Sequence, residues 1–189
     1  MRGKKYSDKF LIHQEKINDL VVKKANEGKK VVRLKNGDPS IFSRLSQELR
    51  ALVKNRIEFE IVPGITAANA AACLSGIPLT DRRLASSCIF VTGHEDPAKG
   101  KSSIDWNKVA GSGTVVLYMA VENLPQIVKK LVIAGKSGKT PVAIIQQASL
   151  TAQKVVIGTL RDIEKRVKEK GIKPPAVIIV GETAGFEKR

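Results

Sequence analysis

The sequence predicts an α/β protein with two lobes, and three observations support this fold class. Short strands and amphipathic helices alternate in the first third of the chain, a pattern typical of parallel strands joined by crossover helices. Two later strands, at 142–146 and 155–157, are separated by a short loop and suit an antiparallel pair in a mixed sheet. Hydrophobic residues make up 42% of the 189 residues, which is enough for a core. We therefore expect a parallel sheet in a first lobe at 1–64 and a mixed sheet in a second lobe at 65–189.

The helices are predicted from apolar residues that recur on one helical face. In chain order they cover 14–26, 42–53, 66–74, 124–134 and 160–170. The strands are predicted from short, buried apolar runs that end at turn residues. They cover 31–34, 59–62, 88–92, 115–119, 142–146, 155–157 and 177–180. The helix at 66–74 is rich in alanine, so we expect it to pack closely against a neighbour. The polar stretch 95–103 is expected to be a surface loop.

The chain is strongly basic, with 33 Lys plus Arg against 18 Asp plus Glu. A positive field of this size attracts polyanions. The basic residues are scattered along the predicted helices, however, and five Phe, two Tyr and one Trp supply few platforms for base stacking. Nucleic acid is therefore not the favoured partner. A solvated lysine surface is the favoured interpretation, while a nucleic acid and a small polycarboxylate or phosphate ligand both remain open.

Cysteine and histidine usage argues against a metal or disulfide site. Cys73 and Cys88 lie in apolar sequence without metal-ligand or redox spacing, so we expect two reduced, buried thiols in a cytoplasmic protein. His13 and His94 have no evident ligand partners, and no metal site is predicted. No secretory pattern opens the chain, and no apolar stretch is long enough to cross a bilayer, so a membrane role is not expected.

Three predicted strands are followed by turns that could hold a ligand, because ligands of α/β sheets bind where strands end. The segment VVRLKNGDPSIF places Asn36-Gly37-Asp38-Pro39 after the first strand. The segment IVPGITAANAAA follows a second strand with a Pro-Gly turn and a helix of small residues, and LYMAVENLP carries Met119 at the tip of a third. Each feature also has a purely structural interpretation, as a turn without a ligand or as a core methionine. No glycine-rich phosphate loop and no Ser-His-Asp or Cys-His arrangement accompanies them.

A series of motifs, in order along the chain, resembles signatures of the tetrapyrrole methylase family. The motifs are HQEKIN, VVRLKNGDPSIFSR, VPGITAANAAACLSGIPLTDRR with VTGHEDP, TVVLYMAVENLP and VVIGTL. Among the branches of the family, these motifs most resemble the enzymes that methylate uroporphyrinogen III. The resemblance covers nearly the whole chain. It implies two α/β lobes with a cleft between them, the first with a Rossmann-like sheet, usually in a homodimer.

The resemblance also implies a reaction. S-adenosylmethionine would donate methyl groups to two pyrrole carbons of uroporphyrinogen III and leave S-adenosylhomocysteine. The product, precorrin-2, leads to sirohaem, cobalamin or haem d1. The substrate is a polycarboxylate, so arginines and a positive field would steer and orient it.

Site residues follow from the resemblance, position by position. The cofactor site is implied to contain Asn36, Gly37, Asp38, Ile41, Thr66, Ala67, Met119 and Ala148. Lys4 falls near a lysine that is assigned a proton-donor role, and Arg44 matches an arginine proposed to act on the tetrapyrrole. Arg82 matches an arginine that faces the substrate carboxylates, and Met119 also borders the substrate.

Three departures from the family pattern qualify these expectations. The family begins with a strand, a Gly-x-Gly-Pro-Gly-Asp loop and a second strand with an aspartate, whereas Met1 falls just before the Lys4 region. The first lobe is therefore expected to be incomplete and turnover impaired. Asn36 replaces a glycine and Ser40 a phenylalanine, although Asn tolerates positive φ well. The residues after Arg44 are Leu-Ser-Gln in place of Gly-Gly-Glu.

Other functions stay open from the sequence. Within the family, the chain could be a later corrin-pathway methylase or an RNA-modifying relative. Outside enzymology, it could be a non-catalytic module that holds a tetrapyrrole or a partner subunit, or a basic nucleic-acid binder. The stretches GIPLTDR and VTGHEDP favour the methylation of uroporphyrinogen III.

Overall fold

The structure is a computed structural model that describes residues 3–95 and 102–186, with side chains from residue 14 onward. The described chain divides into two compact units. The first contains residues 3–66, and the second contains residues 67–95 and 102–186. Within the described residues, no helix is both long enough and apolar enough to cross a membrane.

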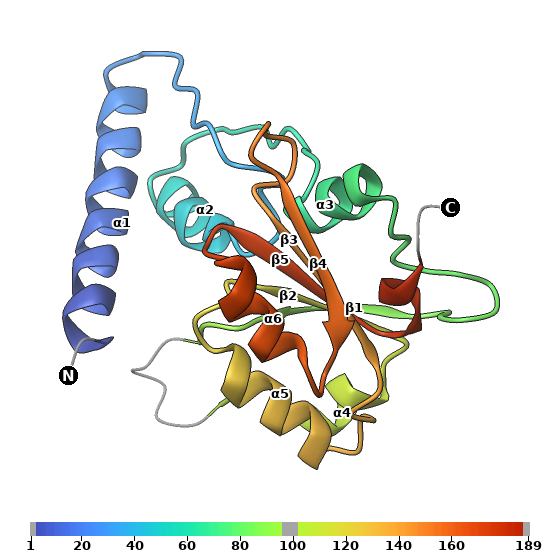
Figure 1. The fold of residues 1–189 in the computed structure, drawn as a ribbon. Helices are drawn as coiled ribbons and strands as arrows, with labels where there is room; N and C mark the ends of the chain where they lie inside the picture. Colours follow the sequence, from blue (N-terminus) through green and yellow to red (C-terminus); the bar gives the residue numbers. More distant parts are fainter. Residues whose placement is uncertain (1–2, 96–101, 187–189) are drawn as a thin grey trace. The chain divides into compact units, whose positions relative to one another are not determined.

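The first unit contains two helices, α1 (Gly3–Asn26) and α2 (Leu45–Lys54). They pack against each other (Figure 1). Lys23 and Lys24 lie in the last turn of α1, where their positive charges interact favourably with the negative end of the helix dipole. Gly28, which follows the helix, has a φ of 74°, a left-handed conformation common after helix ends. Both helices overlap the ranges predicted from apolar periodicity.

The parallel sheet predicted for the first lobe is not present in residues 3–66, and this part of the prediction was wrong. The segments 31–34 and 59–62 are not strands. Their apolar side chains are exposed, with Val32 at 73%, Leu34 at 79% and Val62 at 72%. A strand needs a hydrogen-bonded neighbour, and a β-branched sequence alone does not supply one. No such neighbour exists for either segment within the described residues.

The second unit is built on a five-stranded sheet in the order β1-β2-β5-β3-β4. The strands are β1 (Cys88–Thr92), β2 (Thr114–Tyr118), β3 (Pro141–Gln146), β4 (Lys154–Thr159) and β5 (Ala176–Val180). Its helices are α3 (Ala67–Ser75), α4 (Trp106–Gly111), α5 (Leu124–Ile133) and α6 (Ile163–Lys170), followed by the 3₁₀ turn η2 (Glu182–Gly185). β1 and β2 are parallel, whereas the other pairs are antiparallel. The predicted α/β class, the mixed sheet and the β3–β4 pair are confirmed.

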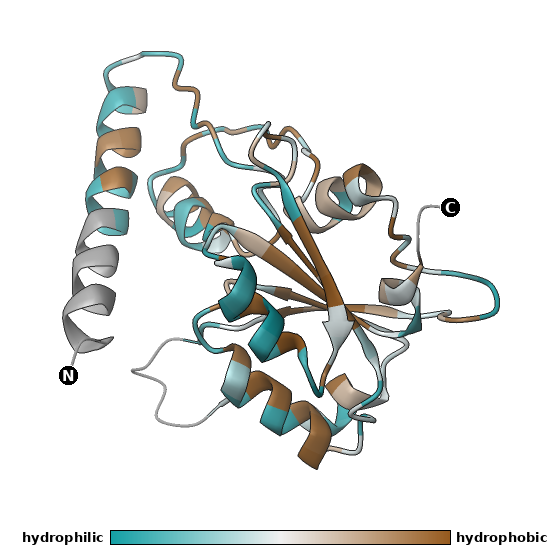
Figure 2. Cartoon of the chain, in the orientation of Figure 1, coloured by the Kyte–Doolittle hydropathy of each residue, from teal (hydrophilic) through white to brown (hydrophobic). Residues whose placement is uncertain are grey.

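The sheet has a core on each face, because alternate residues of a strand point to opposite sides. Val115, Leu117 and Ile144 belong to a cluster with residues of α4, α5 and α6. Val116 and Ile145 belong to the opposite cluster, which α3 covers with three alanines. The central strands are accordingly largely brown, which marks hydrophobic residues, in Figure 2.

The cysteine prediction needs a correction. Cys73 is exposed and Cys88 is half-buried, and both are free thiols. Ala68, Ala71 and Ala72 form the buried face of α3, so Cys73 falls on the opposite side of the helix. An apolar sequence neighbourhood therefore did not identify which face of this short helix is buried.

Candidate functional site

The predicted turn in the first unit is tied to the Pro63-Gly64 turn by one carboxylate. Asp38 Oδ1 accepts a hydrogen bond from the Ser40 amide at 2.8 Å and another from the Ser40 hydroxyl. Asp38 Oδ2 accepts from the Gly64 amide at 3.2 Å. These bonds from Ser40 and Gly64 lower the pKa of Asp38 below its ordinary value, so the group is ionised at neutral pH. The carboxylate that the sequence assigned to the cofactor therefore also joins the two turns.

Glycine is required where these turns meet. Gly37 has a φ of 83°, in the left-handed region that favours glycine. A Cβ on Gly64 would lie 2.4 Å from the Gly37 carbonyl oxygen, which is closer than packed atoms approach. Asn36, Gly37, Asp38 and Ile41 therefore belong to one tight loop, and the second turn lies directly against it.

The same loop ends in strained backbone. Phe42 and Arg44 have φ values of 47° and 61°, although neither is glycine. Arg44 is also the residue that precedes α2, and its carbonyl oxygen accepts from the Gln47 amide at 3.0 Å. Non-glycine residues in this region cost about 1–3 kcal/mol and are found disproportionately at ligand sites. The residue predicted to act on the tetrapyrrole is thus one of these outliers.

In the second unit, three strands end at one edge of the sheet. β2 is parallel to β1, and β5 lies antiparallel between β2 and β3. The carboxyl ends of β1, β2 and β3 therefore share an edge, with Met119 following β2 and Gln147 following β3. β5 begins between them, since Tyr118 pairs with Val177 and Gln146 with Ala176. Two predicted cofactor residues, Met119 and Ala148, thus lie at the same edge with one strand between them.

Backbone strain also concentrates at this edge. Met119 has a φ of 52°, and the residues on both sides of Ala148, Gln147 and Ser149, have φ values of 49° and 73°. The turn after β3 is held in this shape by a bond from the Gln147 amide to the Pro175 carbonyl at 3.0 Å and by one from the Ser149 amide to the Gln153 side chain at 3.1 Å. Sequence reasoning named Met119 and Ala148 but missed Gln147 and Ser149.

The N-terminus of α3 is fixed to this edge. The Ala68 amide donates to the Tyr118 hydroxyl at 3.2 Å. The Tyr118 ring in turn makes an edge-to-face contact with Phe90 of β1, with centroids 5.9 Å apart. The first residue of α3, Ala67, therefore belongs with Met119 and Ala148. Thr66, directly before α3, is buried and lies in the first unit.

The loop after β1 belongs to this edge as well. The Gly93 amide donates to the Tyr118 carbonyl at 2.6 Å, and Asn123 Nδ2 donates to the Gly93 carbonyl at 2.7 Å. A Cβ on Gly93 would lie 2.5 Å from Ala120. This glycine begins the VTGHEDP motif's turn, and Asn123 is a residue that the sequence reasoning did not single out.

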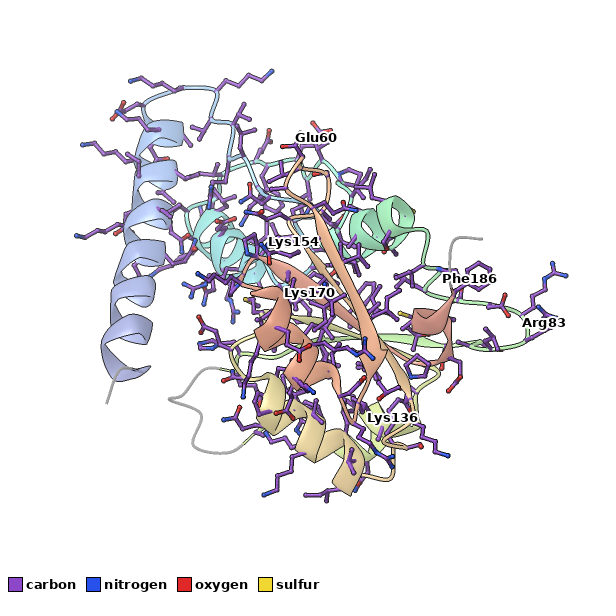
Figure 3. The ribbon with its side chains drawn as sticks, in the orientation of Figure 1. Glu60, Arg83, Lys136, Lys154, Lys170 and Phe186 are labelled. Atoms are coloured by element: carbon purple, nitrogen blue, oxygen red, sulfur yellow. The ribbon has the colours of Figure 1, made fainter. Side chains whose placement is uncertain are left out.

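The remaining predicted residues lie elsewhere. Arg82 is exposed on a tight turn that Asp81 and Ala85 close with two backbone hydrogen bonds of 3.0 Å. Its neighbour Arg83 points away from the ribbon (Figure 3). This turn precedes β1, so it lies at the amino edge of the sheet, opposite Met119 and Ala148. Lys4 lies in α1, among the residues whose side chains fall outside the described part.

The described residues contain no group of three or more His, Cys, Asp or Glu side chains placed to hold a metal ion. Each unit contains tight turns of its own, with Gly37 and Gly64 in those of the first unit and Ala148 in that of the second, where Ala67 begins α3. Such turns present backbone groups to a ligand without bulky side chains in between. They suit the binding and orientation of an organic cofactor.

Comparisons with known proteins identify the family of this chain. Residues 2–164 match the family described as Tetrapyrrole (Corrin/Porphyrin) Methylases. The S-adenosyl-L-methionine-dependent uroporphyrinogen III methyltransferase of Methanosarcina barkeri is 44% identical over 179 residues, which is 94% of this chain and 70% of that protein. A siroheme synthase of Methylobacillus flagellatus is 43% identical over 98% of this chain, but the chain spans only 39% of its length.

Solved structures give the same result. Uroporphyrin-III C-methyl transferase from Thermus thermophilus, complexed with S-adenosyl homocysteine, superposes with a TM-score of 0.77 at 33% identity. The match covers 90% of this chain and 74% of that one. A cobalt precorrin-4 methyltransferase superposes with a TM-score of 0.81 at 26% identity, over 91% and 72% of the two chains. The sequence matches and the fold together show that this chain belongs to the tetrapyrrole (corrin/porphyrin) methylase family.

Proposed function

We propose that the chain transfers methyl groups from S-adenosylmethionine to two pyrrole carbons of uroporphyrinogen III and forms precorrin-2, for sirohaem or cobalamin synthesis. The observation that supports this most directly is the left-handed backbone at Met119, Gln147 and Ser149. Met119 is one of the positions that the family motifs assign to the cofactor, and Gln147 and Ser149 flank another, Ala148. Relatives named for this reaction match at 44% identity and over 94% of the chain.

The chemistry explains why no conspicuous catalytic constellation is needed. S-adenosylmethionine supplies an electrophilic methyl group, and the pyrrole carbon of a porphyrinogen is electron-rich. The protein therefore has to align donor and acceptor, an effect that contributes up to about 7–11 kcal/mol. The bonds that fix the turns, from Gly64 to Asp38 and from Ala68 to Tyr118, suit this role because they set the backbone before a ligand arrives.

Side-chain roles are assigned by position in the motifs. Asn36, Gly37, Asp38, Ile41, Thr66, Ala67, Met119 and Ala148 would contact the cofactor. Lys4 and Arg44 would act on the tetrapyrrole, Lys4 as a proton donor. Arg44 and Met119 would contact the substrate, with the Arg44 guanidinium pairing its carboxylates. For Arg82, the motif is the sole support for a contact with the substrate carboxylates, because its turn lies at the opposite edge of the sheet from Met119.

We also propose that the chain works as a homodimer in the cytoplasm, as the family resemblance implies, and that its charge serves a polycarboxylate and not nucleic acid. Light scattering coupled to gel filtration tests the dimer. The proposal requires a mass of twice 20.5 kDa. A mass of one chain at micromolar concentration would contradict it.

Calorimetry with S-adenosylhomocysteine tests the cofactor assignment. The wild-type chain should bind it, and Gly37→Val should abolish binding, because a β-branched residue is strained at φ 83°. Gly28→Val is the matched control, since Gly28 has a φ of 74° and open space around it. An anaerobic assay should then show two methyl groups added to uroporphyrinogen III. Absence of heat at millimolar ligand, from folded wild-type protein, would overturn the proposal.

Arginine substitutions test the substrate assignment. Arg44→Ala with Arg82→Ala should weaken tetrapyrrole binding and leave salt-sensitive retention of DNA nearly unchanged. Lys165→Ala with Lys168→Ala on α6 removes the same charge from the second unit and should leave tetrapyrrole binding intact. Equal loss of DNA and tetrapyrrole binding in the arginine variant would indicate one non-specific surface.

A further inference from the structure

A buried ion pair lies at the base of the 36–43 loop, and none of the roles assigned above uses it. Glu48 lies on α2, and its Oε2 atom is 2.6 Å from Nζ of Lys35, the residue directly before the loop. The two side chains are only 10% and 12% exposed. Charged pairs are seldom so well buried unless each partner is compensated.

Lys35 also spans the loop from one end to the other. Its backbone precedes Asn36, while its Nζ atom donates to the Ser43 carbonyl at 2.7 Å. Ser43 lies between the two strained residues Phe42 and Arg44, and its hydroxyl donates to the Pro39 carbonyl within the same loop. The Lys35 ammonium thus binds the end of the loop at Ser43, between the two residues whose backbone conformation is strained.

Further donors complete the surroundings of Glu48. Oε1 accepts from Arg33 Nε at 3.2 Å and from Gln14 Nε2 at 3.1 Å. Burial raises the pKa of Glu48, but the hydrogen bonds from Lys35 and Gln14 and the charges of Lys35 and Arg33 outweigh it, so the pKa is lowered overall. Glu48 is therefore ionised at neutral pH and holds the Lys35 ammonium in place.

We infer that Glu48 is a positioning residue, which acts through Lys35 to fix the backbone of the 36–43 loop for S-adenosylmethionine. The inference rests on the proposed function, because the loop is assigned to the cofactor there. Glu48 itself needs no contact with the ligand. Its effect reaches the site through the Ser43 carbonyl, which Lys35 holds.

The test compares Lys35→Met/Glu48→Met with the wild-type chain. Methionines of similar length replace the pair without leaving a buried charge, and such replacements are often neutral for stability. Arg33 is 42% exposed and can turn to solvent. We expect a melting temperature close to wild type, but affinity for S-adenosylhomocysteine lower by about tenfold or more, because small misplacements of a binding group have large effects.

Hydrogen exchange provides a readout that needs no ligand. The Ser40 and Ile41 amides are bonded within the loop, to Asp38, and should exchange faster in the double variant while the amides of α2 do not. Glu27→Gln is the matched control. It breaks an exposed pair with Lys24 and Lys29 in the same unit, at 2.9 and 3.0 Å, and should change neither affinity nor loop exchange.

The outcomes separate this inference from the proposed function. If the folded double variant binds S-adenosylhomocysteine as tightly as wild type, Glu48 is not a positioning residue and the proposed function stands. If the wild-type chain itself binds no S-adenosylhomocysteine, the proposed function fails. In that case hydrogen exchange alone decides whether the Lys35–Glu48 pair fixes the 36–43 loop. Unchanged exchange of the Ser40 and Ile41 amides in the double variant overturns that claim.

Discussion

At the scale of single residues, one missing side chain lets the two turns of the first unit meet. The Gly64 amide bonds Asp38, and its Cα lies against the Gly37 carbonyl, where a Cβ would stand 2.4 Å away. A methyl group at this position must push the turns apart. The bond to Asp38 would lengthen with them, and the carboxylate would lose one of the donors that keep its pKa low.

Gly64→Ala should therefore lower affinity for S-adenosylhomocysteine by at least about tenfold and destabilise the first unit by about 1–3 kcal/mol, the usual range for overpacking. Gly138→Ala is the control, because a Cβ there meets nothing within 4 Å. Calorimetry and thermal melts of both variants make the measurement. Wild-type affinity in Gly64→Ala would mean that the contact between the turns is not needed for binding.

Met119 allows a second test at this scale, because its strain and its proposed function act in opposite directions. Glycine adopts the φ of 52° freely, so Met119→Gly should relieve roughly 1 kcal/mol of strain and raise the melting temperature. It should also weaken S-adenosylhomocysteine binding. Arg56→Gly removes a similar strain, at φ 56°, from an exposed position after α2. It should leave affinity unchanged. Equal affinities in the two variants would remove Met119 from the site.

At the scale of elements, a predicted strand formed only where the fold supplies a neighbouring strand to pair with it. Strand 88–92 was predicted to the residue, because its apolar run has β2 beside it and a core beneath it. The segments 31–34 and 59–62 have equally suitable sequences, yet they form no strand, since pairing depends on neighbours that local sequence does not specify. For the site, the motifs assign Met119 and Ala148 to the cofactor, and the assignment stays a prediction. The Lys35–Glu48 pair links residues too far apart in sequence for spacing to reveal it.

Helix α6 illustrates how one carboxylate fixes an element. Asp162 accepts from the Thr159 amide at 2.6 Å and from Arg166 Nε at 2.6 Å. Together with the Thr159 hydroxyl, they lower the pKa of Asp162 from 3.8 to about 2. A group whose pKa falls on folding stabilises the protein above its unfolded pKa, and this stabilisation is lost as the pH falls through the folded value. The relevant window is therefore from about pH 4 down to about pH 2.

Asp162→Asn should cost about 1 kcal/mol at pH 7, a value reduced for screening because the carboxyl is 35% exposed. The difference from wild type should shrink as the pH approaches 2. Urea unfolding across this range makes the measurement. Glu169→Gln, which removes an exposed pair with Lys165 at 3.8 Å, should show no comparable effect. If the loss of unfolding free energy in Asp162→Asn stays constant down to pH 2, the ionised carboxylate is not its source.

At the scale of the whole molecule, the two units differ in how much apolar surface they bury. Both hydrophobic clusters belong to the second unit. The first unit has several large apolar side chains that are mostly exposed, namely Val32, Leu34, Val62 and Ile65. Its polar contacts include the exposed Asp38 network and the buried Glu48 network, which secure turns and not a core. Burial of apolar surface is the main favourable contribution to folding, so the first unit should unfold at a lower free energy than the second.

Hydrogen exchange at increasing urea should therefore show two stages. Amides of α2 should lose protection first, while amides of β2 and β3 should stay protected until global unfolding.

Limited proteolysis should give first cuts within 29–35 and 55–63. The exposed turn at 147–153 is the internal control, because it is accessible but anchored to the sheet at Pro175, so it should be cut later. S-adenosylhomocysteine should slow the early cuts, since a ligand that binds the closed form stabilises it. Simultaneous loss of protection in α2 and β3 would show instead that the two units unfold as one.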